Sequence, residues 1–361
     1  MYNQKRPRQR ARGKFRQHTK FSHSKRGGRF RGGPKSSKLD ISSFINKTAS
    51  SFVPEKVFVP EYSFADFKLN SALLRSIEEK GYTQPTPIQD KIIFPILQGR
   101  DVVGLANTGT GKTAAFLFPL IEKVLQNPHE QILIIAPTRE LALQIGQELQ
   151  SITKRMRVYS VICVGGEQIW IQIRKLRYKN NFVIGTPGRL IDLVKRGAFI
   201  LNGVHTVVLD EADRMLDMGF IADIRFLMSH VPKERQTLCF SATMSKTIGA
   251  LISDFLKNPS TISVKTTETP KNIEQDVVRV RYLNKVDILH DLLQNNEFKK
   301  VLVFGRTKRG VENLSRILTR RGVKVESIHS NKTQTQRKRA LLSFKQNRVQ
   351  ALVATDVAAR G

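Results

Sequence analysis

The sequence predicts an α/β protein with two parallel-sheet lobes, preceded by a basic N-terminal segment. Two observations predict the sheets. Short, continuously apolar runs alternate with amphipathic helical stretches, and this alternation stops at a polar segment around Pro270 and then starts again. Strands that are apolar on both faces are typical of parallel sheets covered by helices on both sides. A chain of 361 residues with 40% hydrophobic residues is long enough for two or three such units.

The N-terminal segment is expected to be disordered. Residues 1–39 contain 14 Lys or Arg and no Asp or Glu, which leaves +17 of the net charge of +31 for the remaining residues (31 − 14). A segment with so few apolar residues cannot bury enough surface to fold. Its RGGRFRGG stretch (26–33) combines arginine with phenylalanine, which indicates auxiliary nucleic-acid binding. A passive basic tail or a localisation signal is the alternative. We assign residues 1–61 to this tail and its linker.

The first lobe is predicted over residues 62–266. Helical periodicity is found between its strands, as at 141–152 and 248–256. The strand candidates lie at 101–106, 131–137, 159–165, 181–186, 205–211, 236–242 and 261–264.

A polar stretch that contains Pro270 predicts an interdomain linker over 267–275, and a second, partial lobe is predicted over 276–361. This lobe is much shorter than the first and stops directly after a strand, so we expect a C-terminally incomplete lobe. Its strand candidates are 276–282, 301–306, 323–329 and 350–355, and its helix candidates are 285–294, 308–320 and 334–346.

Charge and cysteine content narrow the classes of function. A pI near 10.5 indicates a polyanionic partner, with a merely solubilising surface as the alternative. The two cysteines, Cys163 and Cys239, lie inside apolar runs and offer neither a disulfide framework nor a zinc spacing. We therefore expect a reducing, cytoplasmic compartment. No apolar run reaches the roughly 18 residues that a membrane span needs, so no membrane partner is expected.

A phosphate-binding loop is predicted where the first strand runs into NTGTGKTAAF. Gly109 and Gly111 allow a tight turn that brings backbone N–H groups close to phosphate oxygens, and the following helix N-terminus favours negative charge. In the GxxxxGK[ST] pattern, Lys112 reaches the β- and γ-phosphates and Thr113 holds Mg²⁺. Ala106 stands where the pattern has its first glycine.

The acidic run Asp210-Glu211-Ala212-Asp213 follows another apolar strand. A strand that ends here can point two carboxylates at the same phosphate site. Asp210 is then the Mg²⁺ ligand, and Glu211 orients and deprotonates the attacking water. The alternative is a solvated strand end.

A GTPase is an alternative, because Asn284-Lys285-Val286-Asp287 matches the NKxD pattern that reads guanine. This stretch lies across the predicted linker from Lys112, and Asn284 reads equally well as a helix N-cap. No DxxG follows a strand of the first lobe, since DEAD has Asp213 at the glycine position. The GTPase interpretation is therefore disfavoured.

The ordered set of motifs resembles that of the DEAD-box ATP-dependent RNA helicases of superfamily 2, over residues 64–361. In order along the chain the motifs are GYTQPTPIQ (81–89), ANTGTGKT (106–113), PTRELA (137–142), Gly165-Gly166, TPGR (186–189), DEAD (210–213), SAT (241–243), VLVFGRTK (301–308), the Gln334 and Arg337 pair, and ATDVAARG (354–361). The stretch His329 to Gln334 resembles the bacterial RhlE-like subgroup. The resemblance implies two RecA-like lobes, with ATP and Mg²⁺ as cofactors and RNA as partner.

For the nucleotide, the resemblance implies that Gln89 reads the adenine edge and that Tyr82 stacks on the base, with Phe64 as the upstream aromatic. The implied phosphate loop comprises Ala106, Asn107, Thr108, Gly109, Thr110, Gly111, Lys112 and Thr113. Ser241 and Thr243 are implied to couple Asp213 to lobe movement.

For RNA, the resemblance implies contacts that do not read bases, so binding is expected to be largely sequence-independent and to favour RNA through its 2′-hydroxyls. The implied contacts are Arg139, Glu140, Gly166, Thr186, Gly188 and Arg189 in the first lobe, and Arg306, Gln334, Arg337 and Thr355 in the second.

Two rival classes remain open: an ATP-gated RNA clamp without turnover, and a DNA-translocating motor of superfamily 2. A monomer is expected, with ribosome-assembly or RNA-decay proteins as partners. Because the chain ends inside its last motif, before the arginine-rich motif that such helicases carry, we expect poor hydrolysis and unwinding from this polypeptide.

Overall fold

We describe a computed structural model of the chain, in which residues 58–264, 275–278, 280, 284–295 and 297–355 are described. Residues 1–57 of the tail and linker predicted over 1–61, residues 267–274 of the interdomain linker predicted over 267–275, and residues 356–361 of the last motif lie outside these residues.

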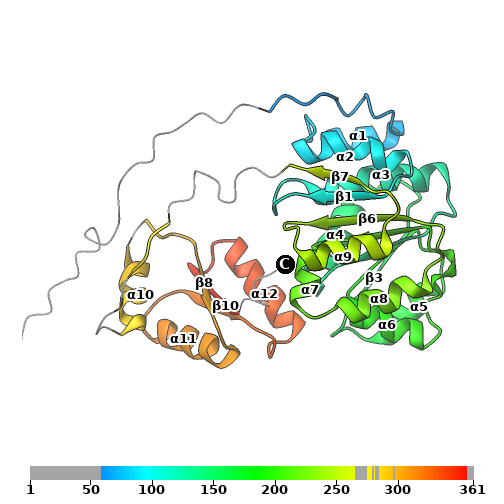
Figure 1. Cartoon of the computed structure of the whole chain (residues 1–361). Coiled ribbons are helices and arrows are strands. Elements are labelled where there is room, and N and C mark those ends of the chain that lie inside the picture. The colour runs from blue at the N-terminus through cyan, green and yellow to red at the C-terminus, as the bar shows by residue number, and fades with distance from the viewer. Residues whose placement is uncertain (1–57, 265–274, 279, 281–283, 296, 356–361) are drawn as a thin grey trace, which may run out of the picture. The chain divides into compact units, whose positions relative to one another are not determined.

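The first lobe contains a seven-stranded sheet in the order β3-β4-β2-β5-β6-β1-β7, and every pairing is parallel (Figure 1). This confirms the predicted fold class. The strands are β1 Val102–Leu105, β2 Ile132–Ile135, β3 Ser160–Cys163, β4 Phe182–Gly185, β5 Thr206–Leu209, β6 Gln236–Ser241 and β7 Ser260–Ser263.

Helices connect successive strands and cover both faces of the sheet. Two helices begin two residues earlier than predicted, because Thr138 and Ser245 accept hydrogen bonds from the N–H groups of Leu141 and Ile248 and thereby cap them. The helices are α1 Ser71–Glu79, α2 Pro87–Leu97, α3 Lys112–Gln126, α4 Arg139–Ile152, α5 Ile169–Leu176, α6 Pro187–Lys195, α7 Ala212–Asp217, α8 Ile221–His230 and α9 Lys246–Phe255, with a 3₁₀ turn at Leu201–Gly203.

The hydrophobic core has two layers, one on each face of the sheet. Ile132 and Ile134 of β2 belong to the layer under α1 to α4, whereas Leu133 and Ile135 belong to the layer that includes residues of α6 to α9. Alternate side chains of a strand point to opposite faces, so a run of four apolar residues fills both layers. This is why the strands appear in the sequence as continuous apolar runs.

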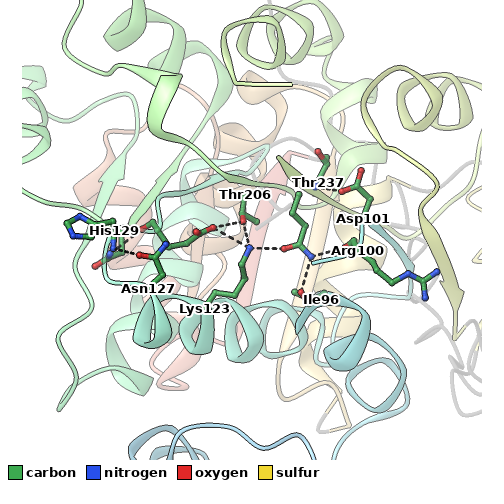
Figure 2. A network of polar contacts seen from close by, with 11 residues as sticks. Ile96, Arg100, Asp101, Lys123, Asn127, His129, Thr206 and Thr237 are labelled. Atoms are coloured by element: carbon green, nitrogen blue, oxygen red, sulfur yellow. Dashed lines mark hydrogen bonds and ion pairs between the residues drawn. The ribbon is translucent and has the colours of Figure 1, made fainter. Parts of the chain in front are cut away.

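A buried polar network joins the N-terminal ends of the strands to the helices (Figure 2). The Lys123 amine of α3 donates to Thr206 Oγ1 (2.8 Å) and to Gln236 Oε1 (3.0 Å), and it pairs with Glu130 at 3.3 Å. The Gln236 amide donates to the Ile96 carbonyl at the end of α2 (3.0 Å). The network lies at the sheet edge opposite to the predicted motifs and fastens α2 and α3 to β5 and β6.

The second lobe contains a three-stranded parallel sheet in the order β8-β10-β9. The predicted helices 285–294 and 308–320 are found with those bounds, and the third ends one residue earlier than predicted. The elements are α10 Lys285–Gln294, β8 Val301–Gly305, α11 Lys308–Arg320, β9 Val325–Ile328, α12 Gln334–Lys345 and β10 Ala351–Thr355.

The strand predicted over 276–282 is not found. Residues 275–278 and 280 have no regular secondary structure, and the remaining positions lie outside the described residues. Val277 is 76% exposed and no described strand pairs with this segment. An alternating apolar pattern forms a stable strand only where a neighbouring strand and a buried face receive it.

Within the described part of the chain, no helix is long and apolar enough to cross a membrane.

Candidate active site

The sheet topology brings three of the predicted motifs to one edge. β5, β6 and β1 are adjacent in the sheet and parallel, so the loops after their last residues leave from the same side. These loops begin at Ala106, Asp210 and Ala242. The Ala106 N–H donates to the Ser241 carbonyl at 3.1 Å, which extends the pairing of β1 with β6 by one step.

The loop after β1 has the conformation that a phosphate-binding turn requires. Gly109 and Gly111 have φ values of +83° and +89°, a region that residues with a Cβ rarely adopt. Gly111 precedes the first turn of α3, so the free N–H groups of that turn face the loop. Lys112 is 7% exposed, and its amine donates to the Ala106 carbonyl at 2.8 Å, across the mouth of the loop.

The carboxylates of Asp210 and Glu211 are held at the end of β5. Asp210 is 2% exposed, and its Oδ1 accepts the Glu211 N–H at 2.9 Å. Glu211 adopts a left-handed conformation with φ of +52°, which is uncommon for a residue with a side chain. Its carboxylate forms an ion pair with Arg214 of α7. Strained backbone of this kind is concentrated at functional sites.

Burial raises the pKa of the Asp210 carboxyl from 3.8 to about 6. Lys112 opposes this shift because its positive charge favours the carboxylate, while Glu211 adds to it. A buried acid beside a lysine-tipped loop is a strong candidate for a cation-binding group, because a bound cation would compensate for the desolvation of the carboxylate.

These groups line one cavity of about 600 Å³, formed entirely by residues of the first lobe. Its volume lies within the range of small-molecule sites. Of the predicted nucleotide contacts, Phe64, Gln89, Ala106, Asn107 and Thr110 are not among the lining residues. The lining comprises Tyr82, Thr108, Gly109, Gly111, Lys112, Thr113, Ala114, Leu141, Gln144, Ile145, Glu148, Asp210, Glu211 and Arg214.

Gln89 is fully buried and connects the start of α2 to the phosphate loop. Its Nε2 donates to the Gly111 carbonyl at 3.1 Å, and its Oε1 accepts the Thr86 N–H at 3.0 Å. Its role as an adenine reader stays a prediction. Through these hydrogen bonds Gln89 stabilises the loop that leads to Lys112.

Tyr82 forms one wall of the cavity. Its ring packs edge-on against Phe64 and Phe118, with centroids 6.3 and 5.3 Å away, and its hydroxyl donates to Glu148 at 3.3 Å. Burial, with a contribution from Glu148, raises the pKa of Tyr82 to about 12. The hydroxyl is therefore a neutral donor at physiological pH. Phe64 supports the ring from behind and does not reach the cavity.

Asp213 is tied to the loop after β6. Its Oδ2 accepts hydrogen bonds from the Ala242 N–H (3.1 Å), the Thr243 N–H (3.0 Å) and the Thr243 hydroxyl (3.2 Å). The Ser241 hydroxyl donates to the Thr243 carbonyl at 2.7 Å. These bonds give the SAT loop one firm connection to the acidic run, which is the contact that a coupling role for these residues requires.

Five of the six RNA contacts predicted in the first lobe surround one surface depression. Arg139, Glu140, Thr186, Gly188 and Arg189 line it together with Gly165. They follow β2, β3 and β4, which are neighbours in the sheet: Gly165 lies in the loop after β3, and the others lie at the starts of α4 and α6. The sixth, Gly166, adjoins Gly165, and the Arg139 guanidinium lies so close to both glycines that a Cβ on either would collide with it.

The second lobe brings its predicted RNA contacts to strand ends and one helix start. Arg306 follows β8 directly. Thr355 is the last residue of β10 and lies opposite Gly305 of β8 in the parallel pairing of the two strands. Gln334 and Arg337 begin α12 at a spacing of three, so they share one side of its first turn.

Three residues that the motif analysis did not select contribute to these sites. Arg214 pairs with Glu211, and Glu148 accepts from Tyr82 and from Lys80 at 2.8 Å. Gln172 hydrogen-bonds to Val164, which precedes the glycine loop, and to Arg189 at the start of α6. In the sequence these three appear only as polar residues at helical spacing, and this pattern does not distinguish them from ordinary surface residues.

The residues of the cavity fit a magnesium-bound nucleotide. Thr113 and Asp210 are both oxygen donors, which Mg²⁺ prefers, and the ion usually takes only one or two carboxylates with phosphate and water as its other ligands. Among the described residues there is no group of three or more His, Cys, Asp or Glu that could hold a metal ion by itself. Such a group is not needed when the phosphates complete the coordination.

Comparison with known proteins gives one consistent result. The sequence pattern described as DEAD/DEAH box helicase matches residues 86–251, and the helicase conserved C-terminal domain matches residues 284–361. Two relatives named DEAD-box ATP-dependent RNA helicase CshA are 48% identical over 303 residues (Geobacillus kaustophilus) and 46% identical over 301 residues (Bacillus subtilis). Both alignments cover 83% of this chain, but only 64% and 61% of the relatives. The chain thus spans a little under two thirds of their length.

A solved structure agrees with these relatives. The crystal structure of a DEAD box protein from the hyperthermophile Methanococcus jannaschii is 39% identical, with a TM-score of 0.56. The similarity covers 84% of this chain and 82% of that one.

Proposed function

This chain belongs to the DEAD/DEAH box helicase family, and from this membership we propose that it acts as an ATP-dependent RNA helicase. It couples ATP hydrolysis to local unwinding of RNA duplexes or to remodelling of RNA–protein complexes. One observation carries the proposal: Lys112, Thr113, Asp210 and Glu211 converge on a single cavity of about 600 Å³.

Each side chain has a distinct task in the proposed reaction. Lys112, held at the mouth of the loop, neutralises the β- and γ-phosphates. Thr113 and Asp210 would hold Mg²⁺, which would supply positive charge to offset that of the phosphates. Glu211 orients the attacking water and accepts its proton, for which its pairing with Arg214 must loosen. Asp213 transmits the state of this site to the SAT loop.

The proposed RNA partner is bound through its backbone and largely without regard to sequence. Support comes from the composition of the depression, where two arginines lie beside half-buried Gly165 and exposed Gly188. We further propose that the protein works as a monomer in the cytoplasm, with ribosome-assembly or RNA-decay proteins as partners. The two cysteines suit a reducing compartment, because both are buried and free.

RNA-stimulated release of phosphate from ATP tests the proposal, measured on the intact natural protein with and without single-stranded RNA. Glu211→Gln should retain binding of a fluorescent ATP analogue but lose turnover by at least about two orders of magnitude. Asp217→Asn is the matched control, because Asp217 ends the short helix that begins just after Glu211 and its side chain is exposed. Binding of ATP and RNA without any phosphate release in the wild type would instead identify an ATP-gated clamp.

A further inference from the structure

The outward face of α5 presents large aromatic side chains to solvent. Trp170 is 73% exposed, and Tyr178, in the turn just after the helix, is 71% exposed. Trp170 is the only tryptophan in the sequence. Figure 1 shows α5 in the first lobe, next to the edge strand β3. Exposed aromatics of this size on a helix usually mark a binding surface.

Positive charge surrounds these aromatic rings. Exposed basic side chains alternate with them along the helix and the turn that follows: Arg174, Lys175, Arg177 and Lys179. None of the four forms an ion pair with another described residue. Trp170 and Arg174 are four residues apart on α5 and share one side of it, and Tyr178 lies in the turn that continues from the end of the helix, so the three form one stripe along α5 and this turn.

The inward face of α5 fixes this stripe to the depression described above. Gln172 is 2% exposed; its Nε2 donates to the Val164 carbonyl at 2.9 Å, and its Oε1 accepts from the Arg189 guanidinium at 2.9 Å. Val164 leads into Gly165-Gly166, and Arg189 belongs to the TPGR motif. One buried amide therefore holds the helix, the glycine loop and Arg189 together, so the aromatic stripe has a fixed position beside the predicted RNA contacts.

We propose that Trp170, Arg174, Lys175 and Tyr178, here called the α5 platform, bind single-stranded RNA that continues beyond the helicase site. Trp170 and Tyr178 stack on unpaired bases, and Arg174 and Lys175 contact the adjoining phosphates. The inference rests on the proposed function, because it extends the RNA path from the glycine loop and Arg189 onto the neighbouring helix.

The charge of the platform favours RNA over a protein partner as its occupant. Basic side chains interleaved with aromatic rings are typical of surfaces that bind single-stranded nucleic acid. The bases stack on the rings, and the phosphates contact the cations. A protein docking on Trp170 and Ile171 would need to bring several carboxylates to compensate for the basic residues around them. The phosphates of one RNA strand can contact all of these basic side chains.

The single tryptophan allows a direct test by fluorescence. Wild-type protein, with a non-hydrolysable ATP analogue, is titrated with RNA of about 6 and of about 20 nucleotides, lengths chosen to fill only the helicase site or to extend past it. Trp170 emission should be quenched by the longer RNA and much less by the shorter one. Binding is followed in parallel by anisotropy of a dye on the RNA, so that binding and quenching are measured separately.

Variants then assign the effect to the platform. Trp170→Ala should weaken binding of the longer RNA roughly 5- to 30-fold, the change expected for one lost base stack, and leave the shorter RNA unaffected. Trp170→Phe should restore most of the affinity. Arg174→Ala should lower the slope of log K against log salt by about 0.7, as for one released phosphate contact. Ile200→Ala is the control, because Ile200 is 70% exposed yet lies outside the platform.

Two results would overturn the inference. If the longer RNA binds with unchanged Trp170 emission and the Trp170→Ala variant binds it equally well, RNA does not contact the platform, which is then a surface for a protein partner. If the wild type binds neither RNA, the proposed function fails together with it. Loss of RNA-stimulated ATPase in Glu211→Gln with normal quenching supports both.

Discussion

Replacing Asp210 by Asn should stabilise the metal-free protein while removing its proposed activity. The carboxyl is 2% exposed, and its desolvation raises its pKa from 3.8 to about 6. Asn has nearly the same shape and carries no charge, so it avoids the cost of ionising a buried acid. The carboxylate that suits Mg²⁺ therefore destabilises the folded protein when no cation is bound.

The structure sets the size of this effect. The pKa of Asp210 is about 6 in the folded state and 3.8 in the unfolded state. The protonated carboxyl is therefore compatible with a stability about 3 kcal/mol higher than that of the ionised carboxylate above pH 7, at about 1.4 kcal/mol for each tenfold change in proton affinity. The folded form binds the proton more tightly, so this stability is present below pH 3.8 and is lost as the pH rises through 6. The new amide leaves its donors without partners, which costs about 1 kcal/mol or more. A net gain of about 1–2 kcal/mol is expected.

Denaturant unfolding of the first lobe in EDTA measures the difference at pH 7.5 and at pH 5. Asp210→Asn should be more stable than the wild type at pH 7.5, and its advantage should fall by about 1.4 kcal/mol and nearly vanish at pH 5, where folded wild-type Asp210 already holds a proton. Adding Mg²⁺ and an ATP analogue should reverse the order, because only the wild type binds them tightly. A variant that is less stable than the wild type at pH 7.5 in EDTA would refute the reasoning.

The other predictions concern three separate regions. Lys123→Met should lower the free energy of unfolding by about 2–4 kcal/mol, because it leaves buried Glu130 without its cation, and nucleotide affinity measured by fluorescence should not change. Asp213→Ala removes three hydrogen bonds to the SAT loop and should abolish duplex unwinding while ATP binding persists; unwinding at the wild-type rate would contradict the coupling role. Deleting residues 1–39 removes 14 basic residues, so RNA affinity should fall and its salt dependence should become flatter; an equal salt slope would exclude the tail from binding.

The strands and helices were largely predictable because their signal is local. All seven strands of the first lobe and all three in the described part of the second were predicted as apolar runs, and α10 and α11 were found with the predicted bounds. The failure at 276–282 has the same origin. The local pattern of that segment is strand-like, but no described strand pairs with it.

Several motif residues in the glycine turn and at strand ends line the cavity, among them Gly111 and Asp210. Gly111 and Asp210 could be assigned from spacing alone, because a glycine turn after one parallel strand and an acid after another must meet at the same edge. Gln89 shows the limit of this approach. Its carboxamide faces the Gly111 carbonyl and Thr86 rather than the cavity, and no spacing rule distinguishes the two directions.

The sequence by itself determined the alternation of strands and helices, the order of the motifs and the large positive charge, because each depends on neighbouring residues or on composition. Only the tertiary structure decided the strand order β3-β4-β2-β5-β6-β1-β7, the pairing of Glu211 with Arg214, and the bridge that Gln172 makes from α5 to Arg189. Those features join residues from different elements, and side-chain packing in three dimensions selects such partners.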